Sequence, residues 1–152
     1  MDVYEKLKEM GLSLPPPVYP KAVYKPVKQA GNMVYVSGQT SSENGVPVVC
    51  GKVGAERTIE EGRRAARICA VNALSHLDNY LGDLNKIKSL VKTLGFVASA
   101  PGFNEQPKVI NGASELFRDL LGEEAGMGAR SSIGVNELPG NVTVEIEFIF
   151  EI

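Results

Sequence analysis

The segment from Ile87 to Ala98 predicts a strand with apolar side chains on both of its faces. Alternation along the strand separates these side chains into two sets, Ile87, Val91 and Val97 on one face and Leu90, Leu94 and Phe96 on the other. Both faces of such a strand need cover, because a large apolar surface left in water marks a contact site. Whatever fold the chain adopts must bury this strand from two sides.

Two segments with apolar residues at steps of three and four predict long amphipathic helices. The first follows the capping-box pair Thr58 and Glu61 and ends at Gly82, and the second spans Val109 to Leu120 and ends before Gly122. Two helices can cover only one face of a sheet. The second cover is most economically another copy of the chain, so we expect a homo-oligomer; the alternative is a monomer with a partly apolar open face.

Four further segments complete the expected order of elements. Strands are predicted at Met33–Ser37 and Val46–Cys50, which we expect to pair across the loop between them, and at Ser131–Val135 and Val142–Phe150, which we expect to be neighbours. The order is then β-β-α-β-α-β-β. This is an α+β layout with both helices on one face of the sheet.

The first 22 residues form a separate N-terminal element. Asp2 and Glu5 predict a short capped helix that stops at Gly11, and the run Pro15 to Pro17 predicts an extended arm over the surface. A chain of 152 residues with 43% hydrophobic and 22% charged residues can close one core. We therefore expect a single domain, 1–152, that carries this helix and arm.

Composition and missing motifs narrow the possible functions. A net charge of −2 disfavours a nucleic-acid surface. The chain has neither the opening of a signal peptide nor a run of about 18 apolar residues, so a cytoplasmic protein without membrane contact is expected. Two cysteines and one histidine give no disulfide framework, zinc spacing or Ser-His-Asp arrangement, and no glycine motif indicates a nucleotide. We expect neither a metal nor a cofactor.

Arg130 and Glu145 remain as candidates, on two strands that we expect to be neighbours joined by a loop with Pro139 and Gly140. Judged by residue type alone, such a pair most often forms a partly exposed salt bridge. The functional alternative has Arg130 binding a substrate carboxylate through two parallel N–H donors, while Glu145 orients or deprotonates a water molecule.

Several segments, taken together and in order, resemble the RidA family, also called YjgF or endoribonuclease L-PSP-like. The matching pieces are Gly31–Gln39, Phe96–Val97, Asn111, Ala129–Ser131, Leu138–Pro139 and Val144–Glu147. The leading helix, the triple proline and the segments 51–54 and 106–112 are similar to a longer branch of that family.

The resemblance implies a chorismate-mutase-like, ferredoxin-like α+β fold that assembles as a homotrimer with a pocket at each subunit interface. Its enzymes hydrolyse reactive 2-imino and enamino acids to 2-oxo acids and ammonia, without metal or cofactor. By the resemblance, Arg130 grips the carboxylate of this small metabolite and Glu145 activates water. The substrate-binding positions would be Tyr24, Ser37, Gly38 (through its backbone), Asn111 and Ser132.

The chain departs from the better-known members at two positions of this pocket. Ser132 stands where they have cysteine, and Gly134 stands where they often have glutamate, so the pocket wall and the substrate range are expected to differ. Cys50 either approaches the pocket or is a structural thiol. Two other functions stay open: a non-catalytic metabolite-binding or regulatory trimer, and an endoribonuclease or translation inhibitor, which the acidic charge and the single histidine disfavour.

Overall fold

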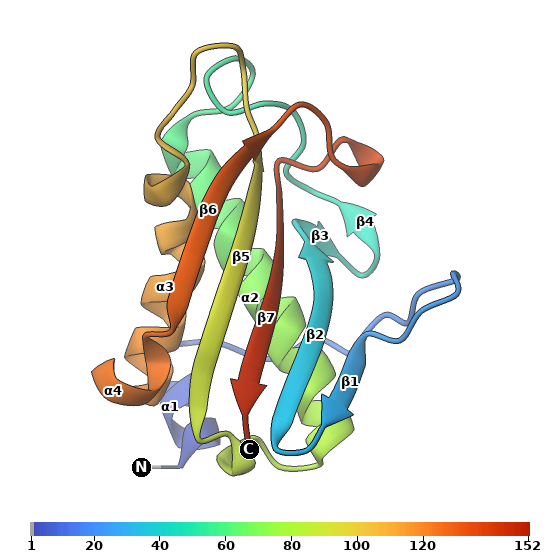
Figure 1. The fold of residues 1–152 in the computed structure, drawn as a ribbon, viewed down its shortest axis with the longest axis vertical. Helices are drawn as coiled ribbons and strands as arrows, with labels where there is room; N and C mark the ends of the chain where they lie inside the picture. Colours follow the sequence, from blue (N-terminus) through green and yellow to red (C-terminus); the bar gives the residue numbers. More distant parts are fainter. Residues whose placement is uncertain (1) are drawn as a thin grey trace.

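The computed structural model describes residues 2–152. Its main elements are one five-stranded sheet and two long helices that pack against one face of it (Figure 1). The strands are β1 (Val27–Ala30), β2 (Met33–Thr40), β5 (Ser89–Ala98), β6 (Ala129–Val135) and β7 (Val144–Glu151). Their spatial order is β1-β2-β7-β5-β6. Only β5 and β6 run parallel.

The remaining elements lie around this sheet. The helices are α1 (Val3–Glu9), α2 (Ile59–Leu81), α3 (Gln106–Leu121) and α4 (Glu123–Gly126), with 3-10 turns at Leu84–Lys86 and Pro139–Asn141. A second, two-stranded sheet consists of β3 (Ser42–Glu43) and β4 (Val46–Pro47). The predicted α+β class, with two helices covering one face, is confirmed.

The partner predicted for β2 is wrong. The segment Val46–Cys50 contributes only β4, which pairs with β3, while β2 pairs with the unpredicted strand β1. Pro47 has no backbone N–H to donate, which limits a strand there to an edge. In β1 only Val27 is buried and three exposed residues follow, so its sequence carries little strand signal.

Local capping sets the start of α2 where the sequence predicts it. The backbone N–H of Glu61 donates to Thr58 Oγ1 at 3.2 Å, and the backbone N–H of Thr58 donates to Glu61 Oε1 at 3.1 Å. The inner face of the helix consists of small side chains that no solvent reaches: Ala65, Ala66, Cys69, Ala70 and Ala73. Such side chains let α2 lie close to the sheet.

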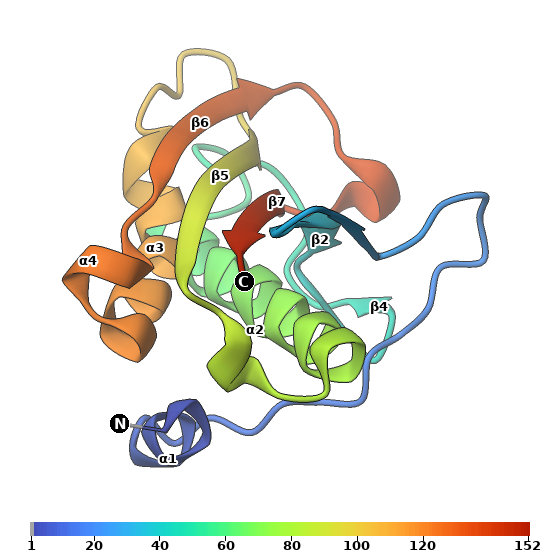
Figure 2. The same ribbon diagram turned by 60° about the horizontal axis from the view of Figure 1, so that its bottom comes forward.

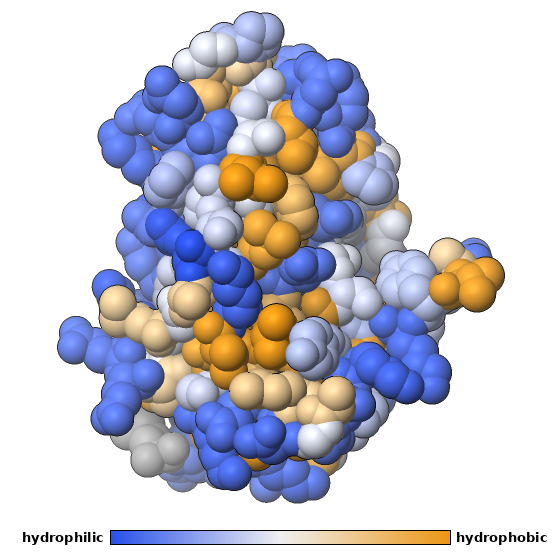
Figure 3. Space-filling model, viewed as in Figure 1, coloured by the Kyte–Doolittle hydropathy of each residue, from blue (hydrophilic) through white to orange (hydrophobic). Residues whose placement is uncertain are grey.

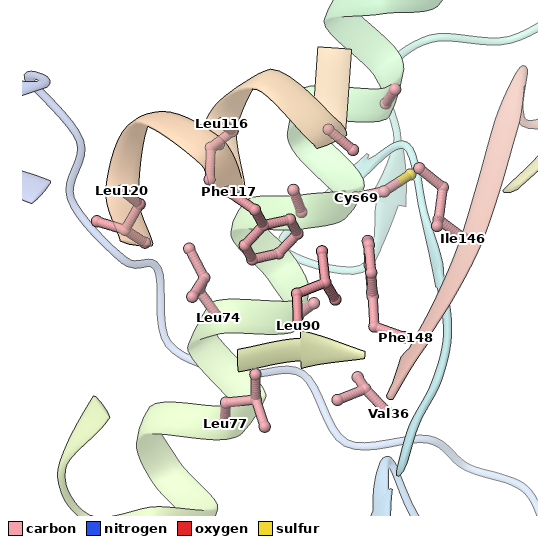
Figure 4. Packing of buried hydrophobic residues seen from close by; sticks show 14 of the residues in the cluster. Val36, Cys69, Leu74, Leu77, Leu90, Leu116, Phe117, Leu120, Ile146 and Phe148 are labelled. Carbon is pink, nitrogen blue, oxygen red and sulfur yellow. The ribbon is translucent and has the colours of Figure 1, made fainter. Parts of the chain in front are cut away.

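The core between helices and sheet centres on Phe117 of α3 (Figure 4). Its ring meets the ring of Phe148 edge-on with centroids 5.1 Å apart, and that of Phe150 at 5.4 Å. Figure 4 also shows Leu74 of α2 and Leu90 of β5 in this cluster. The core therefore joins both long helices to the central strands.

No other part of residues 2–152 covers the opposite face of the sheet (Figures 1 and 2). Leu94 and Phe96 of β5 lie on this face, and Tyr35 and Ile133 on flanking strands are 46% and 44% exposed. In Figure 3, apolar residues run along the middle of this face. The two-sided character predicted for the segment 87–98 is therefore present.

The predicted assignment of side chains to the two faces of β5 is partly wrong. A bulge between Leu90 and Lys92 shifts the alternation, and Leu90 joins Val97 on the helix-covered face. Val91 falls within this irregularity, and Ile87 precedes the strand.

The N-terminal helix and arm extend along the helical side of the molecule. The Asp2 carboxylate accepts hydrogen bonds from the backbone N–H groups of Tyr4 and Glu5 and so caps α1 as predicted. Residues 12–26 have no helix or strand and pass close to α2 before they reach β1 (Figure 2).

Candidate functional site

Arg130 is fixed by neutral groups of α3. It lies on the edge strand β6, paired with the buried Thr93 on the helix-covered face. Its Nη1 donates to Asn111 Oδ1 at 2.7 Å and to Ser114 Oγ at 3.1 Å. Asn111 and Ser114 are three residues apart and therefore share one face of the helix.

No carboxylate pairs with Arg130 among residues 2–152, whereas Arg57, Arg63 and Arg118 each have an acidic partner. Partial burial lowers the pKa of Arg130, yet a guanidinium stays charged at any ordinary pH. The salt bridge to Glu145, the alternative based on residue type alone, does not form within the chain. Arg130 thus carries a half-buried positive charge that its own surroundings do not neutralise.

Arg130 and Asn111 line a cavity of about 330 Å³, the Arg130 cavity. Glu115 also lines it, but its carboxylate is bound by Arg63 at 2.5 Å. Several N–H donors of the Arg130 guanidinium remain after its two bonds to α3, which is what recognition of a planar anion requires. The cavity can therefore accept a small carboxylate.

Ser132 and Gly134 follow Arg130 on the same face of β6. The Ser132 Oγ is buried and has no hydrogen-bond partner among residues 2–152. A Cβ on Gly134 would lie 2.6 Å from the side-chain amide of Gln106, so this amide occupies the space that a larger residue would fill. Gln106 lines neither the Arg130 cavity nor the cavity in front of Glu145, and its contact with Gly134 was not predicted from the sequence.

Glu145 is the second residue of β7, and its side chain lies on the face of the sheet that the helices do not cover. It alternates with the buried Val144 and Ile146, and its cross-strand partner on β5 is Phe96. Burial raises the pKa of its carboxyl, and the like charge of Glu147 raises it further. In the described chain its carboxylate makes no hydrogen bond or ion pair.

The Glu145 carboxylate leaves no room for a side chain at position 38, where the chain has Gly38. It lies in a bulge of β2, and a Cβ there would lie 2.8 Å from Glu145 Oε2. Any side chain at this position would push the carboxylate away. Gly38 and Glu145 therefore lie side by side, while the backbone contact to substrate expected of Gly38 stays a prediction.

Tyr24, Gly38 and Glu145 line a second cavity of about 450 Å³, the Glu145 cavity. Ser37 lines neither cavity; its Oγ donates to the Lys25 carbonyl at 2.6 Å, and its N–H donates to the Pro26 carbonyl at 2.9 Å. Ser37 thus ties the segment that carries Tyr24 to β2. Cys50 lines neither cavity.

The expectation that Arg130 and Glu145 lie on neighbouring strands is wrong. β5 lies between β6 and β7 (Figure 1). The cross-strand partner of Arg130 on β5 is Thr93, and that of Glu145 is Phe96. Along the strand direction, Arg130 and Glu145 are therefore also three residues apart. Standard strand spacings place their Cα atoms about 14 Å apart. Within one chain the two side chains lie on opposite faces and in different cavities.

Between Asp2 and Ile152, nowhere do three or more His, Cys, Asp or Glu side chains come together in a way that could hold a metal ion. None of the helices in that range is long and apolar enough to cross a membrane.

Comparison with known proteins identifies the family. A family model described as "YjgF/chorismate mutase-like, putative endoribonuclease" matches residues 5–151. The chain belongs to the YjgF family. This confirms the resemblance read from the segments around Gly38, Arg130 and Glu145.

Three similar proteins show how far the likeness extends. Protein TCP17 of Trypanosoma cruzi is 38% identical over 150 residues, covering 99% of this chain and 94% of that protein. The crystal structure of Atu1372 from Agrobacterium tumefaciens, a protein "with unknown function", is 46% identical with a TM-score of 0.90, covering 99% of this chain and 93% of that one. RidA from the Antarctic bacterium Psychrobacter sp. PAMC 21119 is 25% identical with a TM-score of 0.62, covering 90% of this chain and 94% of that one. The similarity to TCP17 and to Atu1372 therefore extends over nearly the whole length of each chain.

Proposed function

We propose that this protein hydrolyses small reactive 2-imino acids, or their enamine tautomers, to 2-oxo acids and ammonia. The observation that carries the proposal is the state of Arg130, a half-buried guanidinium held by Asn111 and Ser114 and paired with no carboxylate of residues 2–152. Such a group suits an anionic substrate. Family membership supports the same substrate class.

The proposed reaction requires mainly that the protein hold the substrate and a water molecule in the right positions. An iminium carbon is already electrophilic, so holding the substrate carboxylate on Arg130 beside a positioned water supplies much of what is needed. The water oxygen bonds to this carbon while Glu145 takes a proton from the water. Glu145 returns this proton to the nitrogen of the tetrahedral adduct. The C–N bond then breaks as the hydroxyl oxygen forms the C=O bond of the 2-oxo acid and gives its proton to Glu145, so that the nitrogen leaves as ammonia. Because burial raises the pKa of Glu145, its carboxylate is a better proton acceptor than an exposed one.

The site is proposed to form between copies of the chain in a homotrimer. Arg130 and Glu145 of one chain lie on opposite faces of the sheet, so they can act on one substrate only if different copies supply them. The uncovered apolar face around Leu94, Phe96 and Ile133 supports an interface there. In this arrangement Arg130 of one subunit binds the substrate carboxylate, and Glu145 of the next faces the water at the other end of the same substrate.

The test follows the decay of freshly generated 2-iminopropanoate with the purified protein. Acceleration over buffer that Arg130→Ala removes, and that the exposed-arginine control Arg64→Ala keeps, supports the proposal. Absence of acceleration contradicts it. Tight binding of a small carboxylate without turnover would favour the metabolite-binding alternative.

Ribonuclease activity is disfavoured as an alternative despite the family description. The net charge of −2 and the single histidine, which is buried and has a pKa that burial lowers, suit neither phosphate binding nor a pair of histidine acid and base. RNA cleavage that survives rigorous purification and disappears in Arg130→Ala would favour the ribonuclease over the deaminase.

A further inference from the structure

The N-terminal arm forms one wall of the Glu145 cavity. Residues 15–20, four of them proline, line it along one side, and Asn72 and His76 of α2 line it from the helix. Tyr24 follows on the same segment. A part of the chain far from Glu145 in sequence thus shapes the space in front of its carboxylate.

Three contacts hold the arm in place. The side-chain amide of Asn79 donates to the Tyr19 hydroxyl, and the Tyr19 ring meets the His76 ring edge-on with centroids 6.0 Å apart. Val18 packs against the turn at Gly45, where an added Cβ would lie 3.2 Å from a Val18 methyl. The arm is therefore a built wall and not a loose tail, and Tyr19 is its main anchor.

The cavity is larger than the smallest substrates. 2-Iminopropanoate has six heavy atoms, and at no more than about 30 Å³ per heavy atom, the share of a molecule in liquid water, it fills at most about 180 Å³. The Glu145 cavity has about 450 Å³. The remainder is available to Arg130 of the next copy, which the proposed site brings to the substrate, and to a substrate side chain larger than a methyl group.

The lining of this space is suited to an uncharged ring. Prolines and two tyrosines dominate the arm side, and Glu145 is the only acidic or basic side chain other than His76 among the described lining residues. Burial lowers the pKa of His76, which favours its neutral form. The side of the cavity away from the arm carries neutral polar side chains, among them Gln39, Thr40 and Asn72. An anionic substrate side chain would find no cation here, whereas an aromatic one can pack on Tyr19 and the prolines.

We propose that Tyr19 and His76 form a specificity wall that selects substrates with a large apolar, preferably aromatic, side chain. The inference rests on the proposed function, since it assigns the substrate class of the same site. It makes Tyr19 a specificity-determining residue for the part of the substrate that lies away from the carboxylate.

The experiment measures binding of two stable product acids by calorimetry, 2-oxo-3-phenylpropanoate and 2-oxopropanoate, to the full-length protein. We expect the phenyl acid to bind at least about tenfold more tightly, the scale at which apolar pockets discriminate. Tyr19→Ala is expected to reduce this ratio several-fold, whereas Tyr19→Phe keeps most of it. Val23→Ala is the matched control, because Val23 belongs to the same segment, is fully exposed and does not line the cavity. Tyr19 is 58% exposed, so its truncation leaves the core intact.

Hydrolysis of the two corresponding imino acids separates this inference from the proposed function. Selective binding that depends on Tyr19, without any turnover, supports the wall and contradicts the deaminase. Turnover with equal kcat/KM for both imino acids, unchanged in Tyr19→Ala, supports the deaminase and overturns the wall. Binding of neither acid overturns the wall as well.

Discussion

Arg130 is held by one face of α3 while its charge stays unpaired, and the function proposed for it depends on that combination. Replacing it by alanine removes a charge-assisted contact of about 1.5–3 kcal/mol with the substrate carboxylate, which corresponds to a loss of about 10- to 100-fold in kcat/KM. Lysine restores the charge without the planar pair of donors, so Arg130→Lys is expected to recover only part of the loss. Steady-state kinetics with 2-iminopropanoate measures both variants. An Arg130→Lys protein equal to the parent would contradict bidentate binding.

Glu145 is expected to reduce stability at neutral pH. Because burial raises the pKa of its carboxyl above the ordinary value of 4.5, the folded chain holds this proton more tightly than the unfolded chain. Below about pH 4.5 both states are protonated and no penalty exists. As the pH rises from there through the folded-state pKa, the unfolded state ionises first and stability falls.

Glu145→Gln is therefore expected to have a higher Tm than the parent at pH 7, with the difference shrinking toward zero near pH 4. Thermal scans across this range measure it, and the exposed Glu124→Gln is the control. A variant with a lower Tm at pH 7 would mean that the carboxylate has a stabilising partner. In the same pH range, the activity of the parent should rise with pH as the carboxylate forms.

The residues of the site could be predicted only in part. The resemblance placed Arg130, Asn111, Gly38 and Glu145, and helical spacing from Asn111 would have added Ser114. The contact of Gln106 with Gly134 had no such signal, because it follows from the missing side chain at Gly134 across the fold.

At the scale of the elements, the contact between α2 and α3 depends on Gly112. A Cβ there would lie 2.1 Å from the Arg63 carbonyl oxygen, a backbone atom that cannot move alone. Alanine ordinarily stabilises a helix by about 1 kcal/mol relative to glycine. Here the helices would have to separate, and overpacking costs about 1–3 kcal/mol or more.

Gly112→Ala is therefore expected to lower the midpoint of urea unfolding despite its better helix propensity. Gly62→Ala is the matched comparison, since its Cβ would meet a methyl of the Val109 side chain at 2.9 Å, which can shift. Its loss should be smaller. A Gly112→Ala protein more stable than the parent would show that the helices are not in close contact there.

Helix ends could be predicted because their signals are local, whereas strand neighbours could not. Thr58 and Gly82 bound α2 through contacts within a few residues. The short connection from Val135 to Val144 is typical of a hairpin, yet it crosses the end of β5 to reach the far side of that strand. Nothing in the connection itself distinguishes the two outcomes, because β6 is placed by its parallel pairing with β5.

At the scale of the whole molecule, the separation of Arg130 from Glu145 leads to a prediction about mixed assemblies. If each pocket takes Arg130 from one copy and Glu145 from the next, an Arg130→Ala chain beside a Glu145→Gln chain forms one intact pocket. An intact pocket takes Arg130 from a Glu145→Gln chain and Glu145 from an Arg130→Ala chain. In randomly mixed trimers of equal composition each of these two conditions is met half of the time, so about one quarter of the pockets are intact.

The most direct test is the rate of 2-iminopropanoate hydrolysis after the two variants are unfolded together and refolded as a mixture. The account predicts about one quarter of the activity of parent protein refolded in the same way, while each variant refolded alone stays nearly inactive. A mixture no more active than the sum of the separately refolded variants would contradict a pocket shared between copies.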